Sequence, residues 1–282
     1  MADTSGAKGW ALTMMRTGYA GRALTYAAVA GLSLWAIWRG GEAQGTGEAM
    51  SALSDTAWGT AVVAGIAVGL IAYALWRLVD AAFDFERYGT DGEGIVARLG
   101  MIVTGLVHGA LGVAAAGVLS GSGGGGEGGV AAAVETVLGW PGGRWIVGLA
   151  GLATLGAGGY YAKKAWKREY RQHLMANEFT QRWDWVLRAG VAAQAVVVAI
   201  AGGLLVVAAY QYDGDEAGGI GRVFEWLSQQ PFGNVLVVLL CIGLLGFGIF
   251  CLVNAAYRII PALHDEDDMP KTLGQSLKEL AA

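Results

Sequence analysis

Six stretches of this chain, each 16 to 32 residues long, contain no Asp, Glu, Lys or Arg. They lie at 23–38, 56–76, 99–126, 145–162, 189–212 and 226–257. A helix needs about 20 apolar residues to cross a bilayer, inside which every backbone N–H and C=O must be hydrogen-bonded within the protein. The first stretch reaches that length only if its helix begins near Gly18 and the guanidinium of Arg22 extends to the surface. The pattern predicts an all-α membrane protein with six transmembrane helices.

The composition excludes several other classes of protein. Of the 282 residues, 55% are hydrophobic and 15% are charged, whereas soluble domains have about 25% charged residues and disordered chains have low hydrophobicity. A net charge of −4 provides no general basic surface for nucleic acid. Two cysteines are too few for a disulfide scaffold or a four-thiolate zinc site. We expect no cofactor and no metal.

The basic residues indicate the orientation. Six spans place the N-terminus, the two links between even and odd spans, and the C-terminus on one side, which carries 16 of the 19 Lys and Arg residues. The opposite side carries only Arg39, Arg144 and Arg222. Because cytoplasmic loops are enriched in Lys and Arg, we expect a multi-pass protein of the cytoplasmic membrane with both termini in the cytoplasm.

Three landmarks recur in the same order along the chain. The odd spans begin with an Arg-x-Gly triplet, at Arg16, Arg98 and Arg188. The even spans are entered through an aromatic residue or Pro next to Gly, at Trp58-Gly59, Trp140-Pro141-Gly142 and Pro231-Phe232-Gly233. Each even span also has a Gly four residues before an aromatic residue, at Gly69/Tyr73, Gly156/Tyr160 and Gly246/Phe250. The concordance predicts three copies of one two-helix unit.

The link inside each unit has apolar residues at helical spacing, around 50–57, 130–137 and 220–227. This spacing predicts a short amphipathic helix, which we expect to lie at the membrane interface. Units that cross twice share one orientation, so the repeats are parallel and related by an axis along the membrane normal. A closed bundle with pseudo-threefold symmetry is the simplest packing, and the sequence does not exclude an open arrangement.

These landmarks set the expected boundaries. The units are 1–91 (spans about 18–38 and 59–79), 92–181 (spans about 99–119 and 145–163) and 182–261 (spans about 189–210 and 233–257), followed by a cytoplasmic tail at 262–282.

The triplicated Arg-x-Gly start, the aromatic/Pro-Gly turn and the Gly-x-x-x-aromatic even span resemble the bacterial membrane family called domain of unknown function 1206. The resemblance covers roughly 10–261. It implies a bacterial cytoplasmic-membrane protein and carries no activity. The second unit departs from the pattern, because its even span continues into Lys163-Lys164-Ala165-Trp166-Lys167-Arg168.

Small residues and one histidine are candidates within the spans. The pairs Gly65/Gly69 and Gly105/Gly109 have the small-x-x-x-small spacing that lets membrane helices approach closely, although a pore lining is an alternative. His108 is the only histidine inside a span, and intramembrane ionisable residues are functional candidates by default. A hydrogen-bonded packing role is favoured for His108 over a proton or ligand role, and a metal is the least favoured.

The cytoplasmic ends of the spans are the most polar part of the repeat. Corresponding i, i+3 positions on the even spans hold Arg77/Asp80, Lys164/Lys167 and Asn254/Tyr257. With Arg16, Arg98 and Arg188, these residues predict a charged ring suited to an anionic solute or a lipid headgroup. Anchoring of helix ends by basic residues is the favoured alternative, but it does not explain the acidic Asp80.

The segment Lys163–Arg171 combines basic and aromatic residues, and we expect it to bind anionic lipid headgroups. In the tail, Leu273, Leu277 and Leu280 form a short apolar stripe that either packs under the bundle or binds a partner. The sequence thus predicts a non-enzymatic structural, lipid-interacting or complex-assembly component of the membrane, with a protein partner or a homo-oligomer as further possibilities. The alternative is a small-solute or ion transporter or channel.

Overall fold

The computed structural model describes residues 4–121, 127–263 and 269–280. Its elements are helical throughout this part of the chain, apart from two isolated β-bridges, Leu174 with Arg258 and Met175 with Thr272. The six long helices are α1 (Thr4–Trp38), α3 (Ala57–Phe83), α4 (Gly92–Leu119), α6 (Gly143–Trp166), α8 (Asp184–Gln211) and α10 (Gly233–Tyr257). The short α-helices are α2 (Thr46–Ser54), α5 (Glu127–Leu138), α7 (Glu178–Arg182), α9 (Ile220–Ser228) and α11 (Leu273–Leu280), and the 3-10 turns are η1 (Glu169–His173), η2 (Gly214–Glu216) and η3 (Pro261–Leu263).

Five of the long helices are long and apolar enough to cross a membrane, namely α1, α3, α4, α8 and α10. Helix α6 has 24 residues, so at 1.5 Å per residue it extends about 36 Å and is long enough to span. It is less apolar than the others because its second half contains Gly158, Gly159, Tyr160 and Tyr161. The prediction of several helices long and apolar enough to cross a membrane is confirmed, and the six-span count stays a prediction.

The long helices pack in an open series. Helix α4 packs on α3, α3 on α1, α1 on α10, α10 on α8, and α8 on α6. A closed threefold ring would also require α4 to pack on α6, but within the described residues these two helices make no extensive contact. The series is therefore interrupted inside the second unit, and threefold symmetry stays a prediction.

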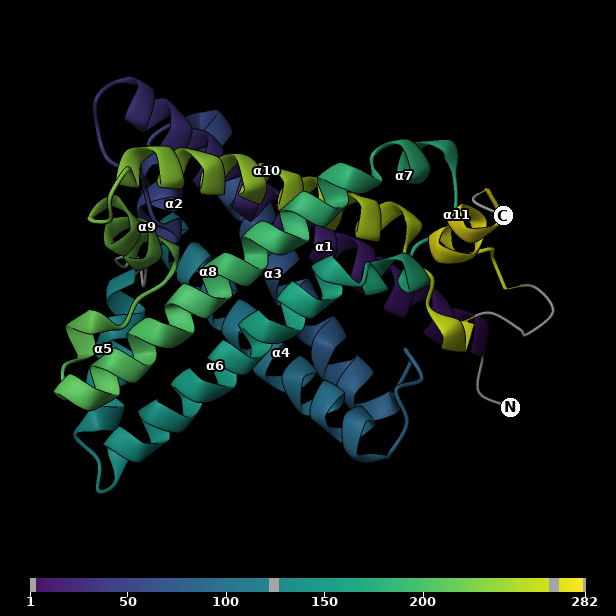
Figure 1. The fold of residues 1–282 in the computed structure, drawn as a ribbon, viewed down its shortest axis with the longest axis horizontal. Coiled ribbons are helices and arrows are strands. Elements are labelled where there is room, and N and C mark those ends of the chain that lie inside the picture. Colours follow the sequence, from purple (N-terminus) through teal and green to yellow (C-terminus); the bar gives the residue numbers. More distant parts are fainter. Residues whose placement is uncertain (1–3, 122–126, 264–268, 281–282) are drawn as a thin grey trace.

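The short helices mark the two ends of the bundle (Figure 1). Helices α2, α5 and α9 lie together at one end, as expected for the three links inside the units. Helices α7 and α11 lie at the opposite end, where α1 begins. We call the first the short-helix end and the second the terminal end.

A glycine is needed where each short helix turns into the next span. A Cβ added to Gly59 would lie 1.9 Å from the carbonyl oxygen of Leu53, in the last turn of α2. The corresponding distances are 1.8 Å from Gly143 to Val137 O and 2.1 Å from Gly233 to Ser228 O. Only a residue without a side chain fits such an approach. This explains the glycine in the repeated turn motif, except that in the second unit the tightly packed residue is Gly143 rather than Gly142.

Glycines also bring α1 and α3 together. A Cβ on Gly21 would lie 2.4 Å from the Cα of Gly69. The other expected packing glycines are less tightly enclosed, since a Cβ would meet its nearest neighbour at 3.5 Å for Gly65, 3.2 Å for Gly105 and 3.4 Å for Gly109. Close backbone contact of this kind replaces the hydrophobic drive that is missing between helices in lipid.

Candidate functional site

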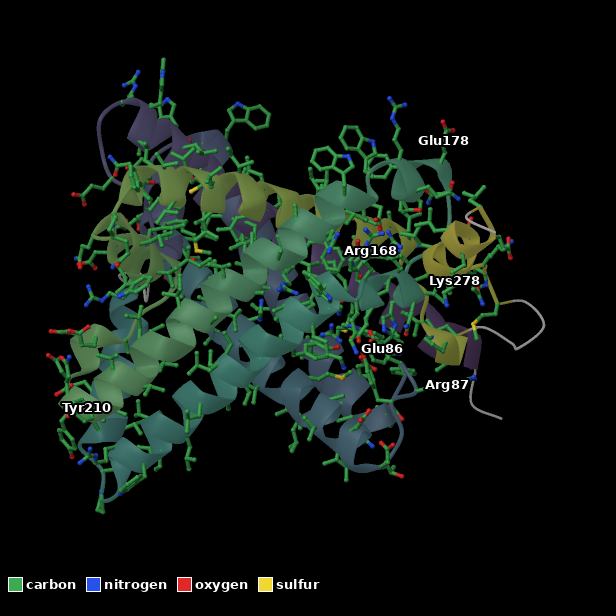
Figure 2. All side chains as sticks on the ribbon, in the orientation of Figure 1. Glu86, Arg87, Arg168, Glu178, Tyr210 and Lys278 are labelled. Carbon is green, nitrogen blue, oxygen red and sulfur yellow. The ribbon has the colours of Figure 1, made fainter. Side chains whose placement is uncertain are left out.

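A buried group of charged side chains lies at the terminal end of the bundle. We call Arg77, Asp80, Glu86, Asn254 and Arg258 the charged cluster. Figure 2 shows Glu86 inside this end, in a region with many side-chain nitrogen and oxygen atoms. The cluster joins α3 and the α3–α4 link of the first unit to α10 of the third unit.

Glu86 is the centre of the cluster. Its carboxylate lies 2.6 Å from Arg258 Nη2 and 3.6 Å from Arg77 Nη1. The side chain of Glu86 is 0% exposed and that of Arg258 is 4% exposed. Arg258 also donates to Asn254 Oδ1 at 2.7 Å. One carboxylate therefore pairs with guanidinium groups from two units, in an interior where an unpaired charge costs several kcal/mol.

Asp80 supports this arrangement from the last turns of α3. Its Oδ2 lies 3.3 Å from Arg77 Nη1, and its Oδ1 accepts a hydrogen bond from the backbone N–H of Glu86 at 3.2 Å. The acid that helix anchoring did not explain thus positions both Arg77 and the α3–α4 link.

The pKa values of Glu86 and His173, which lie outside the spans, are shifted by their surroundings. Burial alone would raise the pKa of Glu86, but the guanidinium groups of Arg258 and Arg77 outweigh it and hold that pKa well below its usual range. Burial and then the charge of Arg258 lower the pKa of His173 to about 3. Glu86 is therefore ionised and His173 neutral at neutral pH.

The predicted ring is only partly assembled. Arg77, Asp80 and Asn254 meet in the cluster, and half-buried Lys164 lies close enough for the charges of Arg258, Glu86 and Arg77 to act on it. Arg16 and Lys167 are exposed, and the carbonyl of Tyr257 accepts a backbone hydrogen bond from Met175.

The Arg of the Arg-x-Gly triplet has a structural role in two units. Arg98 donates to the carbonyl oxygens of Ala81 at 2.7 Å and Ala82 at 3.1 Å, at the end of α3. Arg188 donates in the same way to Ala165 O at 3.1 Å, at the end of α6. Basic side chains commonly satisfy the last carbonyls of a helix. In these two units the motif thus joins the odd span to the preceding even span without a ligand, whereas Arg16 in the first unit is exposed.

Arg22 is the largest departure from the sequence analysis. The expectation that its guanidinium reaches the surface is wrong, because Arg22 is 4% exposed. Its Nη1 donates to the Tyr73 hydroxyl at 2.8 Å, and its guanidinium carbon lies 4.7 Å from the Tyr73 ring and 5.3 Å from the Phe247 ring. Among the described residues its Nε has no hydrogen-bond partner.

His108 lies beside this group on α4. Its Nδ1 is 2.8 Å from the carbonyl oxygen of Thr104, one turn earlier, and its ring packs edge-on against Tyr73 with centroids 4.9 Å apart. A carbonyl can only accept, so Nδ1 carries the proton. This geometry favours the packing role for His108. No group of three or more His, Cys, Asp or Glu in the described part of the chain is arranged to hold a metal.

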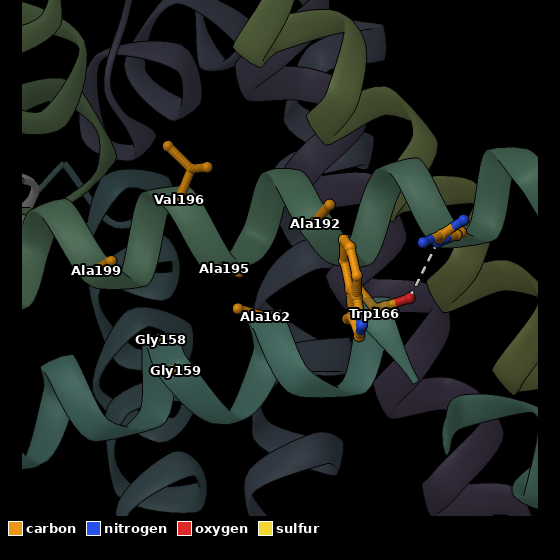
Figure 3. A pocket seen from close by; sticks show the side chains of 10 residues that line it. Gly158, Gly159, Ala162, Trp166, Ala192, Ala195, Val196 and Ala199 are labelled. Atoms are coloured by element: carbon orange, nitrogen blue, oxygen red, sulfur yellow. Dashed lines mark hydrogen bonds between the residues drawn. The ribbon is translucent and has the colours of Figure 1, made fainter. Parts of the chain in front are cut away.

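A second feature lies on the outer side of the bundle, between α6 and α8. A groove of about 400 Å³ is lined by small residues and ends at Trp166 and Arg188; Figure 3 shows Gly158, Ala162 and Ala195 along it and Trp166 at one end. Trp166 is 78% exposed. The exposed basic residues Lys163, Lys167 and Arg168 follow at the same end of α6.

The tail packs back on the chain, which is the first of the two roles expected for its apolar stripe. Leu273 is fully buried and its N–H bonds to Leu174 O at 2.8 Å, while Leu280 is 72% exposed. Residues 264–268 and 281–282 of the predicted tail lie outside the described residues.

Sequence reasoning missed Arg22, Glu86, Arg258 and His173. Arg22 and Arg258 each lie at the edge of a charge-free stretch, so the sequence pattern indicates the end of a span at both residues and no partner for either. One signal is present in the sequence: the positions four residues after the glycine of each Arg-x-Gly triplet hold Arg22, Thr104 and Gln194. All three are polar, which a lipid-facing position does not favour.

Comparison with known proteins agrees with the repeat. The family model Domain of Unknown Function (DUF1206) matches three times, at 17–84, 99–168 and 189–258. A Bacillus subtilis (strain 168) relative, described as "Uncharacterized protein YxxB", is 25% identical over 226 residues, which are 77% of this chain and 80% of the relative. No solved structure matches the chain.

Proposed function

Because the chain belongs to the family of the Domain of Unknown Function DUF1206, whose description names no activity, we propose a function from its own geometry. The protein is a non-enzymatic component of the cytoplasmic membrane that interacts with anionic lipid. Its six long helices all span the bilayer, with α6 as the sixth, and the terminal end faces the cytoplasm. The proposal is supported by the excess of basic residues at that end.

A labelling experiment tests this topology. The native Cys241 and Cys251 are buried, so single cysteines introduced as Ser54→Cys at the short-helix end and Lys278→Cys in α11 report accessibility. In intact cells, a membrane-impermeant maleimide is expected to label the Ser54→Cys variant and to label Lys278→Cys only after lysis. Labelling of both variants in intact cells contradicts the topology.

The groove between α6 and α8 is the observation that carries the lipid proposal. An apolar groove takes an acyl chain, and its end is marked by Trp166 together with Lys163, Lys167 and Arg168. Exposed tryptophan favours the headgroup level, and each basic residue near the surface contributes about 1 kcal/mol of attraction to anionic lipid. A phospholipid therefore satisfies both parts of the site.

Lipid retention measured by native mass spectrometry tests the assignment. The variant Lys163→Gln/Lys167→Gln/Arg168→Gln is compared with Arg16→Gln/Arg87→Gln/Arg182→Gln, three exposed basic residues elsewhere in the chain. The first variant is expected to lose its preference for phosphatidylglycerol over phosphatidylcholine by more than tenfold, given about 1 kcal/mol per charge. Equal loss in both variants argues for a general charge effect and against this site.

A structural or assembly role belongs to the same proposal, with a protein partner or a second copy of the chain as occupant of the remaining surface. It predicts co-purification after mild solubilisation, and a strictly monomeric, partnerless preparation counts against it.

A second candidate function is transport of a small anionic solute or ion. The observation in its favour is the buried charge of Arg22 within α1 and of Arg77 and Asp80 within α3, because charged residues inside a membrane commonly mark ion pathways. Flux into proteoliposomes is the assay, with Asp80→Asn as the control variant. Absence of anion flux in the wild type contradicts transport.

A further inference from the structure

The buried positive charge of Arg22 has no acidic partner in the described part of the chain. Beyond their first turns, the six long helices contain a single acidic residue, Asp80, which is paired with Arg77. The remaining nearby acid, Glu86, is occupied by Arg258 and Arg77. The charged cluster holds two guanidinium groups and two carboxylates that pair with one another, and Arg22 adds a positive charge with no carboxylate partner among the described residues.

The contacts of Arg22 do not remove this charge. The Tyr73 hydroxyl oxygen accepts from Arg22 Nη1 at 2.8 Å and from Arg77 Nε at 3.0 Å, so both of its lone pairs are used. The rings of Tyr73, Tyr26 and Phe247 provide cation–π attraction, which offsets about 2 kcal/mol for a desolvated cation. That is less than the several kcal/mol needed to bury an ion, and Nε still lacks an acceptor.

The neighbouring helices add a further cation near Arg22 and, among the described residues, no carboxylate that pairs with it. Lys164 on α6 lies within electrostatic range of Arg22, and no described carboxylate pairs with it. The helices that carry His108 and Lys164, α4 and α6, make no extensive contact with each other. The side of the bundle that carries these two residues is therefore not closed by a packed pair of long helices.

We propose that Arg22 is the primary ligand of an internal anion-binding site that takes an oxyanion, meaning a phosphate or carboxylate group. Guanidinium suits oxyanions because it presents a fixed set of N–H donors. The anion supplies the negative charge that the chain lacks and accepts from Nε. The oxyanion comes either from solution or from a lipid headgroup. The site requires neither the α6–α8 groove nor transport.

The test uses the full chain in nanodiscs of phosphatidylcholine, with sulfate titrated against chloride at constant ionic strength. Sulfate at ten times its Kd is expected to raise the unfolding midpoint of the wild type by about 3 °C. In a second arm, phosphatidylglycerol replaces part of the lipid without sulfate. A shift in the first arm identifies a soluble anion, and a shift in the second arm alone identifies a lipid headgroup.

The variant Arg22→Gln separates this proposal from a packing role. It is expected to lose the anion-dependent shift and to be no less stable than wild type in chloride, because the uncompensated charge is gone. Arg16→Gln, an exposed arginine on the same helix, retains the shift. Should Arg22→Gln not fold, Arg22→Lys keeps the charge and is expected to show a reduced shift. Absence of any shift in wild type in both arms, or an unchanged shift in the Arg22 variant that folds, overturns the proposal.

Discussion

Removing the carboxylate of Glu86 is expected to destabilise the bundle far more than removing any surface charge. In Glu86→Gln, Arg258 loses the negative charge at 2.6 Å and is left with neutral partners, namely the amide at position 86, the amide of Asn254 and a weak contact with the Tyr19 ring. Arg77 keeps Asp80 at 3.3 Å. One guanidinium thus becomes a buried, unpaired cation, for which the loss of its partner costs about 3–5 kcal/mol. For a chain of this size that corresponds to a fall of about 10 °C in the unfolding midpoint.

The assay is thermal unfolding of the purified protein in one detergent, measured as the fraction of protein that stays monodisperse after heating. Glu93→Gln is the matched control, because Glu93 is exposed in the first turn of α4. The double variant Glu86→Gln/Arg258→Gln removes both charges and is expected to recover about 2 kcal/mol relative to the sum of the single variants. A midpoint for Glu86→Gln within 1 °C of Glu93→Gln would refute the reasoning, because it would mean that the carboxylate is not the sole compensation for Arg258.

Two other predictions concern helix packing and pH. Gly21→Ala is expected to lower the free energy of unfolding by about 1–3 kcal/mol, because its Cβ would lie 2.4 Å from Gly69 Cα. The control is Gly31→Ala on the same helix, whose Cβ meets nothing within 4 Å and which is expected to be neutral or slightly stabilising. Equal effects of the two variants on the unfolding midpoint would show that the packing of α1 on α3 does not depend on this contact. His173 has a pKa lowered to about 3 by burial and Arg258, so its contribution to stability is complete above its ordinary pKa of about 6.5 and falls as the pH drops towards 3. Glu86, with its lowered pKa, contributes fully above pH 4.5. Between pH 7.5 and 5 the wild type is therefore expected to lose about 1 kcal/mol that His173→Asn does not lose, after allowance for the half-exposed ring; parallel profiles of the two proteins speak against a neutral buried His173.

The sequence predicted the helices well because hydrophobic periodicity and charge-free length act locally. The turn glycines and the Arg-x-Gly starts were found by repetition alone, and the structure supplies their reasons in Gly59, Gly143 and Gly233 and in the carbonyl caps of Arg98 and Arg188. The cluster was found only in part, because its centre, Glu86, lies in a link and meets Arg258 across 172 positions of sequence. No local pattern encodes such a partner. The packing of α4 and α6 was equally beyond reach, since a repeat predicts equivalent units but not whether the series of helices closes.

The repeat itself explains why a polar site in this bundle is asymmetric. Equivalent positions on the even spans hold Arg77, Lys164 and Asn254, and those on the odd spans hold Arg22, Thr104 and Gln194. Arg at both places in every unit would add buried guanidinium groups that the described carboxylates cannot pair, at a cost of several kcal/mol for each ion. Divergence of the units at these positions avoids that cost. A cation without a carboxylate partner, as at Arg22, leaves a charge that the proposed anion would balance.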